Sequence, residues 1–321
     1  MHLITINPHP NTLPSLSTVL ESGDEPAACG NHRTLVLANH QSTGDVPLLM
    51  GAWNPRPGVL SNLMWIMDRV FKFTNFGIVS VLHEDFFIQA GRARRDASLE
   101  ELRRHIIHSY IPLGRQFMVL FPEGGFLHKR REISHRFADK NNLPKLEYVT
   151  LPRAGAMKVI MEEIGPHREN CPGTSQNENS KRENHSTRNV PRAVAATSAH
   201  LEWVLDVTIA YPDRVPLHLI QDVVCGIRPP CSIRLHYRLY PITEIPSDAE
   251  GMTQWLYDRF IEKDRMLEEY YRTGQFPTTS DTQVVRQVRQ DNLRFLILHA
   301  FFIASTYVQY KLFHAVWSWI W

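Results

Sequence analysis

Residues 34–53 read TLVLANHQSTGDVPLLMGAW, in which a short apolar run meets a polar turn and a second apolar run follows. Residues 34–39 are typical of a buried strand, because a short aliphatic run stops at a polar loop. The Ser-Thr-Gly sequence at 42–44 favours a turn. The run after Asp45 is typical of the first turns of a helix, where Pro47 is tolerated. We therefore predict a strand, a tight turn and a helix.

Further along the chain, short apolar runs alternate with segments of helical period. Helices are predicted at residues 97–110, where leucine and isoleucine recur at helical spacing, and at residues 255–277. Strands are predicted at residues 78–82, 117–121, 148–152, 203–212 and 232–241. This alternation predicts an α/β fold with a central, mainly parallel sheet flanked by helices.

The C-terminal end of the chain is strongly apolar. The stretch FLILHAFFIASTYVQY, residues 295–310, contains no Asp, Glu, Lys or Arg. With Lys311 snorkelling, the apolar segment reaches the length of about 20 residues that a membrane span needs. We expect residues 293–321 to form a hydrophobic membrane helix, and the alternative is a buried or interfacial helix. Basic residues just before the segment place the main domain in the cytosol by the positive-inside rule.

Composition divides the rest of the chain. Residues 166–192 are polar and poor in apolar side chains, so we expect a mobile insertion there. This insertion interrupts a predicted domain that covers residues 32–280. Residues 1–31 contain several prolines and no clean hydrophobic period, and the sequence assigns them no role.

The bulk composition disfavours some classes of function. The formal net charge is +2, which gives no whole-chain attraction to nucleic acid, and no groove-reading motif accompanies the basic clusters. We therefore expect no nucleic-acid partner. The four cysteines match no zinc-binding spacing, which predicts no metal site and favours a reducing compartment.

His40 and Asp45 flank the predicted turn, and three interpretations of this pair are open. A metal site needs three or four ligands, and the other histidines lie on different predicted elements. In a structural interpretation, Asp45 or Thr43 caps the helix and His40 bonds to a loop carbonyl. In a catalytic interpretation, the Asp45 carboxylate accepts from one imidazole nitrogen. That contact fixes the tautomer and leaves the other nitrogen as a base.

The catalytic interpretation depends on the backbone between the two residues. Side chains five residues apart on an unbroken helix diverge by about 140°, so His40 and Asp45 can meet only if the chain bends. The Ser-Thr-Gly turn supplies such a bend. The sequence has no G-x-S-x-G elbow, so we expect the histidine to activate a substrate hydroxyl.

Four short motifs resemble those of the glycerolipid acyltransferases, the group that includes bacterial lysophosphatidate acyltransferase. Residues 39–45, NHQSTGD, resemble the NHxSxxD motif of that family. Residues 87–92, 121–125 and 149–152 resemble its second, third and fourth motifs, in the same order. Longer stretches, among them MWIMDRVFKFTNFGIVS and WLYDRFIEKD, are similar to the subgroup of acyl-CoA:lysophosphatidylglycerol acyltransferases. The resemblance therefore extends over most of the chain.

The resemblance implies a reaction and a location. His40 would be the general base, and Asp45 would orient its ring. The hydroxyl of a lysophospholipid (lysophosphatidylglycerol, lysophosphatidylethanolamine or a related glycerolipid) would attack acyl-CoA, which is a co-substrate, and no bound cofactor is expected. The partners would be acyl-CoA, a lysophospholipid and a membrane. The implied location is the endoplasmic reticulum membrane, with the catalytic domain facing the cytosol.

The resemblance also implies substrate-binding residues. An arginine fork suits the phosphate of the acceptor, and glycines permit close approach of substrate. The substrate-binding residues predicted in this way are Arg92, Glu123, Gly124, Gly125, Lys129 and Arg130. The alternatives are that the basic residues form a solvated face and that Glu123 is an acid at a helix N-terminus.

The chain departs from the family pattern in two places. Many members have an arginine soon after the Glu-Gly of the third motif, whereas Gly125 and Phe126 follow here, so we expect the positive charge from residues 129–131. Members also carry a membrane-embedded apolar segment before the first motif, and residues 1–31 contain none. We therefore expect an incomplete N-terminal segment. The alternative function is a non-catalytic membrane-surface protein that binds lipid or acyl-CoA.

Overall fold

The structure is a computed structural model of the whole chain. It describes residues 18–24, 29, 32–89, 91, 94–166, 200–225, 227–229, 231–277, 286–288 and 292–320. Arg92, most of the segment 1–31 and all but the first residue of the insertion 166–192 lie outside these described residues.

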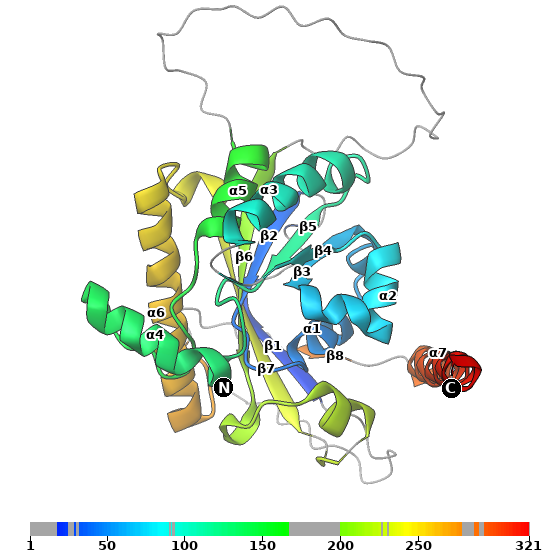
Figure 1. The fold of residues 1–321 in the computed structure, drawn as a ribbon. Helices are drawn as coiled ribbons and strands as arrows, with labels where there is room; N and C mark the ends of the chain where they lie inside the picture. The colour runs from blue at the N-terminus through cyan, green and yellow to red at the C-terminus, as the bar shows by residue number, and fades with distance from the viewer. Residues whose placement is uncertain are drawn as a thin grey trace, which may run out of the picture.

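A mixed, mostly parallel sheet forms the centre of the molecule (Figure 1). Its strand order is β4-β3-β5-β2-β6-β7-β1-β8. The pairs from β4 through β6 and the β7–β1 pair are parallel, whereas β6–β7 and β1–β8 are antiparallel. The strands are β1 (Thr18–Gly23), β2 (Arg33–Ala38), β3 (Leu63–Asp68), β4 (Phe86–Ile88), β5 (Phe117–Leu120), β6 (Leu201–Ala210), β7 (Ser232–Pro241) and β8 (Arg286–Val288).

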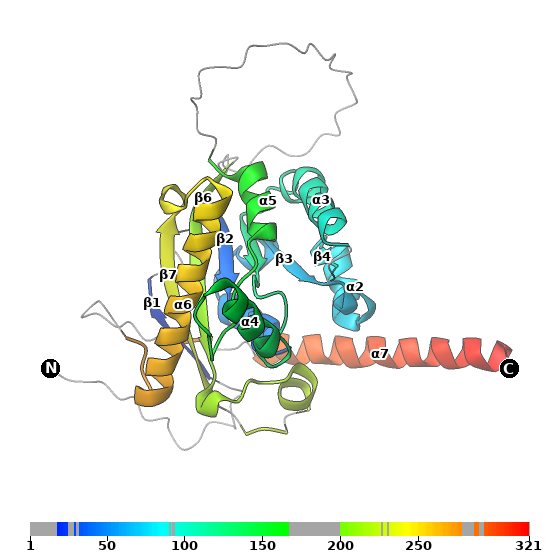
Figure 2. The same ribbon diagram turned by 60° about the vertical axis from the view of Figure 1, so that its left-hand side comes forward.

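Helices cover both faces of this sheet (Figures 1 and 2). One core packs β2 side chains such as Leu35 and Leu37 against α3, α5 and α6, and the other packs Val36 and Ala38 against α1. Alternate side chains of β2 thus pack into two separate cores, and the predicted α/β fold is confirmed. The α-helices are α1 (Asp45–Trp53), α2 (Asn75–Leu82), α3 (Arg95–His105), α4 (Leu127–Asn141), α5 (Gly155–Ile164), α6 (Ala249–Thr273) and α7 (Asn292–Ile320).

Short helical turns connect several of these elements. They are η2 (Leu60–Asn62), η3 (Arg69–Phe73), η5 (Ile106–Tyr110), η6 (Pro212–Arg214), η7 (Leu219–Val224) and η8 (Ile242–Glu244). The helix predicted at residues 255–277 is α6, and it ends at Thr273 because Gly274 adopts the left-handed conformation at its C-cap, with φ of 78°.

Two predicted strands are wrong. Residues 78–82 lie in helix α2, whose first turn is capped by the Thr74 side chain accepting from the Gly77 N–H at 3.1 Å. A short apolar run does not by itself distinguish a strand from a buried helix. Residues 148–152 are outside any strand, because their backbone N–H groups donate to side chains and not to a neighbouring strand. The Thr150 N–H bonds to Glu123, and the Leu151 N–H bonds to Ser134 Oγ.

Four strands were not predicted, namely β1, β3, β4 and β8, and β1 shows one reason. Residues Thr18–Gly23 form β1, which pairs in parallel with β7 and antiparallel with β8. Its buried charged residue Glu21 accepts two hydrogen bonds from the Arg56 guanidinium and one from the Tyr237 hydroxyl. A carboxylate inside a strand interrupts the alternation of apolar and polar residues, and its partners lie far along the chain.

The C-terminal helix α7 extends away from the body of the molecule (Figure 2). Among the described residues, one helical segment is long and apolar enough to cross a membrane. This segment is Leu296–Trp319, and none of it is buried inside the protein. Its 24 residues correspond to about 36 Å of helix. This length and composition suggest that the protein associates with a membrane.

Candidate functional site

Three neighbouring parallel strands end at the same edge of the sheet. In the order β5-β2-β6, the segments just after the strands carry Glu123, His40 and Tyr211, respectively. Ligand sites of open α/β sheets lie at the carboxyl ends of the strands. The topology therefore brings together residues from three distant parts of the sequence.

His40 and Asp45 meet across the turn. The distance from His40 Nδ1 to Asp45 Oδ2 is 2.8 Å. The same oxygen accepts from the Gln41 N–H at 2.7 Å and from the Ser42 N–H at 3.0 Å. Because Oδ2 accepts throughout, Nδ1 is the donor in this pair and the neutral ring keeps its lone pair on Nε2.

The other oxygen of Asp45 is bonded as well. The Tyr211 hydroxyl donates to Asp45 Oδ1 at 2.5 Å, and both side chains are fully buried. Burial, together with the Asp45 charge, raises the pKa of Tyr211 well above its ordinary value, so the phenol remains a donor. Both oxygens of Asp45 thus have fixed donors, which holds the carboxylate in one orientation.

Neither Asp45 nor Thr43 caps helix α1. The N-cap residue is Gly44, without a side-chain hydrogen bond to the helix, and Asp45 is the first helical residue. Thr43 Oγ1 instead accepts from the Leu219 N–H at 3.0 Å. Ser42 Oγ accepts from the Gly44 N–H at 3.1 Å and donates to the Leu217 carbonyl, which fixes the bend.

Two aromatic rings surround the His40 imidazole while leaving it accessible. Phe121 stacks on it with ring centroids 4.2 Å apart, and Phe126 lies 4.5 Å away in a tilted arrangement. The His40 side chain remains 13% exposed, against 0% for Asp45. The ring is therefore held in place and can still be reached by a substrate.

Glu123 connects three of the sequence motifs. Its Oε1 accepts from the His40 N–H at 2.6 Å, and its Oε2 accepts from the Thr150 N–H and hydroxyl, both at 2.8 Å. The side chain is 1% exposed. Burial raises the pKa of Glu123 to about 8, and the hydrogen bonds from His40 and Thr150 counteract part of that rise. The Leu127 N–H also bonds to the His40 carbonyl at 2.9 Å.

The two glycines of the third motif have backbone conformations that favour glycine. Gly124 has φ of 68° and Gly125 has φ of 153°. A Cβ on Gly125 would lie 3.1 Å from Cδ of Arg130. These conformations turn the chain from β5 into α4.

The metal interpretation gains no support from the described residues, where no group of three or more His, Cys, Asp or Glu side chains is placed to hold an ion.

Comparisons with known proteins show the family of the chain. Residues 14–166 match the model of the Acyltransferase family, and residues 223–300 match that of the acyltransferase C-terminus. Over 297 residues, the chain is 41% identical to acyl-CoA:lysophosphatidylglycerol acyltransferase 1 of Mus musculus, covering 92% of this chain and 76% of that protein. The chain belongs to the acyltransferase family.

A second curated relative of this acyltransferase gives the same assignment. The human acyl-CoA:lysophosphatidylglycerol acyltransferase 1 is 40% identical over 297 residues, with the same coverage of 92% and 76%. The crystal structure of the 1-acyl-sn-glycerophosphate acyltransferase from Thermotoga maritima is 15% identical, with a TM-score of 0.40, and the match covers 82% of this chain and 75% of that one. The resemblance carried by the four motifs is confirmed, and the chain is an enzyme of the acyltransferase class.

The predicted basic residues of this acyltransferase are only partly placed. Lys129 is exposed and its ammonium lies 5.6 Å from the centre of the Phe126 ring. Arg130 is half-buried beside Gly125, and burial lowers its pKa. Arg92 lies outside the described residues. Lys129 and Arg130 thus lie in the first turn of α4, close to the aromatic residue that contacts His40.

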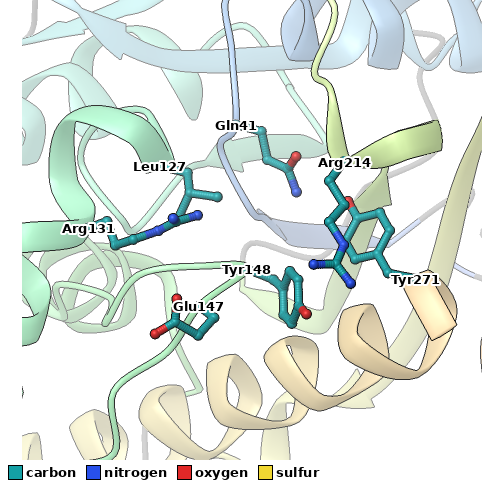
Figure 3. A pocket seen from close by; sticks show the side chains of 7 residues that line it. All are labelled: Gln41, Leu127, Arg131, Glu147, Tyr148, Arg214 and Tyr271. Atoms are coloured by element: carbon teal, nitrogen blue, oxygen red, sulfur yellow. The ribbon is translucent and has the colours of Figure 1, made fainter.

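Sequence reasoning did not find Tyr211, or a pocket beside the histidine. Tyr211 follows directly after β6, so the end of a parallel strand was the signal that could have found it. The pocket has a volume of about 270 Å³ and opens next to Gln41, the neighbour of His40 (Figure 3). Its lining residues are Gln41, Leu127, Arg131, Glu147, Tyr148, Arg214 and Tyr271.

Proposed function

We propose that this acyltransferase transfers an acyl group from acyl-CoA to a hydroxyl of a lysophospholipid: lysophosphatidylglycerol, lysophosphatidylethanolamine or a related glycerolipid. The observation that carries this proposal is the 2.8 Å contact between His40 Nδ1 and Asp45 Oδ2, beside an imidazole that remains accessible. The names of the mouse and human relatives support acyl-CoA as the donor and a lysophospholipid as the acceptor.

His40 acts as the general base in this mechanism. Its Nε2 takes the proton from the acceptor hydroxyl while the hydroxyl oxygen attacks the thioester carbonyl. The carbon–sulfur bond then breaks, and the coenzyme A sulfur takes the proton from the imidazolium. The products are the ester and the free thiol, and the ring returns to its neutral form. Such proton transfer contributes roughly 10²–10⁴-fold to the rate.

Asp45, Tyr211 and Glu123 act through the histidine. Asp45 holds Nδ1–H and stabilises the imidazolium as it forms. Tyr211 fixes the Asp45 carboxylate from the buried side. Glu123 accepts from the His40 backbone, so we assign it a positioning role in place of direct contact with substrate.

The glycine-rich turn supplies the anion-binding part of the proposal. The Gly124 N–H donates a hydrogen bond to the Phe121 carbonyl at 3.1 Å. The Gly125 N–H has no acceptor within the described part of the chain, and we assign it to the thioester oxygen as negative charge develops there. Lys129, Arg130 and Arg92 are assigned to anionic groups of the two substrates.

The proposal includes a location and a domain plan. Residues 32–280, with the insertion 166–192, form most of the acyltransferase domain, and β1 of the N-terminal segment 1–31 adds a strand to its sheet. Residues 293–321 form a membrane helix, supported by the length and composition of α7. We assign the protein to the endoplasmic reticulum membrane, with the catalytic domain on the cytosolic side.

The test is a substrate panel with the full chain purified in detergent. Several acyl-CoAs are combined with several lysolipids, free thiol is measured, and the ester product is identified by mass spectrometry. A matched acceptor whose free hydroxyl is replaced by hydrogen corrects for thioester hydrolysis. We expect thiol release that depends on the hydroxyl, with a stoichiometric diacyl product. Binding of acyl-CoA without any product would refute the proposal and favour a non-catalytic binding protein.

A further inference from the structure

We infer that the pocket beside Gln41 is a binding subsite for the phosphate ester of a substrate. This inference rests on the proposed acyl transfer and specifies where a substrate anion is held. The pocket has a volume of about 270 Å³. That is below the roughly 300–1,000 Å³ of sites that enclose a drug-sized ligand, so it suits a head group and not a whole lipid.

Arg214 provides one positively charged wall of the pocket. Its guanidinium carbon lies 5.2 Å from the Tyr148 ring centre and 5.3 Å from that of Tyr271. Contact with aromatic faces leaves the edge N–H groups of a guanidinium available for hydrogen bonds. The side chain is exposed, and within the described residues it has no carboxylate at salt-bridge distance.

The backbone that carries Arg214 has an unusual conformation. Asp213 has φ of 58° and Arg214 has φ of 59°, both in the left-handed region that residues with a Cβ rarely adopt. The two residues end η6, which follows Tyr211 at the edge of the sheet where His40 lies. From this turn the Arg214 side chain reaches the lining of the pocket.

Arg131 provides a second charge from the opposite side (Figure 3). It lies in the first turns of α4, is exposed, and has no ion pair with the described residues. The Gln41 side chain reaches between the two arginines in the same view. Glu147 is the one acidic residue in the lining, and its Oε1 lies 3.7 Å from His135 Nε2. The lining thus carries two positive guanidinium groups and one carboxylate, and this charge balance favours an anion. Phosphate oxygens match the geometry of the guanidinium N–H groups.

The pocket shares its walls with the candidate catalytic site. Gln41 directly follows His40, and the Leu127 N–H bonds to the His40 carbonyl at 2.9 Å. An acceptor whose hydroxyl lies at His40 Nε2 carries its phosphodiester only a few bonds away. The phosphates of coenzyme A have the same chemistry, so kinetics must decide which substrate places its phosphate here.

The kinetic test uses Arg214→Gln and Arg131→Gln. Arg136→Gln is the matched control, because Arg136 is an exposed arginine on the same helix α4 that does not line the pocket. The Michaelis constants for acceptor and acyl-CoA are measured separately. We expect the constant for one substrate to rise about 10–100-fold, as for the loss of a charge-assisted hydrogen bond, with little change in kcat. A rise for the lysophospholipid assigns the acceptor phosphate, and a rise for acyl-CoA assigns the donor.

A binding measurement separates failure of the subsite from failure of the proposed function. Titration calorimetry on the full chain in detergent uses glycerophosphoglycerol and coenzyme A as probes, with glycerol as the uncharged control. We expect one phosphate probe to bind, about tenfold more weakly to Arg214→Gln, with Arg214→Lys intermediate because it keeps the charge and loses the fork. Thermal unfolding checks that each variant is folded. Binding without turnover would leave the subsite standing and refute the enzyme proposal. Turnover with both Michaelis constants and both probe affinities unchanged in the two variants would overturn the subsite.

Discussion

Replacing Asp45 by asparagine removes one charge and keeps the shape of the side chain. In the wild type, Oδ2 accepts from His40 Nδ1, the Gln41 N–H and the Ser42 N–H, and Oδ1 accepts from Tyr211. Three donors at one position favour the amide oxygen there, so the amide nitrogen faces the tyrosine oxygen. We therefore expect the variant to keep the His40 tautomer and the fold.

The loss of activity then measures how much the negative charge of Asp45 stabilises the transition state. At the observed 2.8 Å and an effective dielectric constant of about 20, a full imidazolium–carboxylate pair is stabilised by at most about 6 kcal/mol. If about half of the charge has developed in the transition state, about 3 kcal/mol is lost, which is roughly a 10²-fold fall in kcat. The buried Tyr211 hydroxyl also loses its acceptor, which costs about 1–3 kcal/mol of folding stability.

The assay is thiol release at saturating acyl-CoA and lysophospholipid, with thermal unfolding as the check on folding. The matched control is Asp85→Asn. Asp85 is a second buried aspartate that pairs with a histidine, His83 Nδ1, at 3.1 Å, but it precedes β4 at the opposite edge of the sheet. We expect Asp85→Asn to turn over substrate like the wild type. A folded Asp45→Asn protein with kcat within about threefold of wild type would refute the electrostatic role.

Three further predictions concern stability and location. Burial raises the pKa of Glu123 to about 8 from its ordinary 4.5, so its contribution to stability is full below pH 4.5 and is lost as pH rises toward 8. The difference in Tm between wild type and Glu123→Gln should therefore change across this window, and parallel Tm curves would contradict it. Lys263→Met leaves the buried Asp206 without its 2.6 Å partner, so we expect the free energy of unfolding in denaturant to fall by about 3–5 kcal/mol. The double variant Lys263→Met/Asp206→Leu should recover most of this loss, and equal losses in both variants would be the contrary result. Truncation before residue 292 should move the protein from the membrane fraction to the supernatant, and an unchanged distribution would count against α7 as the anchor.

The part of the site that is contiguous in sequence was predictable. A strand, a Ser-Thr-Gly bend and a helix bring His40 and Asp45 together, and the turn chemistry within this segment was the signal. Their contact was one of three open interpretations until the motifs of a family favoured it. The alternating apolar segments predicted the α/β fold for the same reason, because strand and helix periods are local properties of the sequence.

The rest of the site depends on contacts between distant segments. Tyr211 reaches Asp45 only because β6 pairs with β2, and Arg214 enters the pocket after the same strand. No local pattern predicts that pairing. Glu123 could be read from sequence as a helix N-terminal acid or a substrate contact, whereas its bonds to His40 and Thr150 depend on three strand ends and loops meeting in space. The wrong strand at 78–82 shows the same limit for a short apolar segment.

The central claim is that His40 Nε2 takes the proton from the acceptor hydroxyl, and His40→Ala tests it most directly. The measurement is single-turnover formation of the ester product, followed by mass spectrometry at saturating acyl-CoA and lysophospholipid, with unchanged thermal unfolding. The account predicts a fall of about 10²–10⁴-fold in the rate of ester formation, with acyl-CoA still bound. Ester formation at the wild-type rate by the folded His40→Ala protein would contradict it.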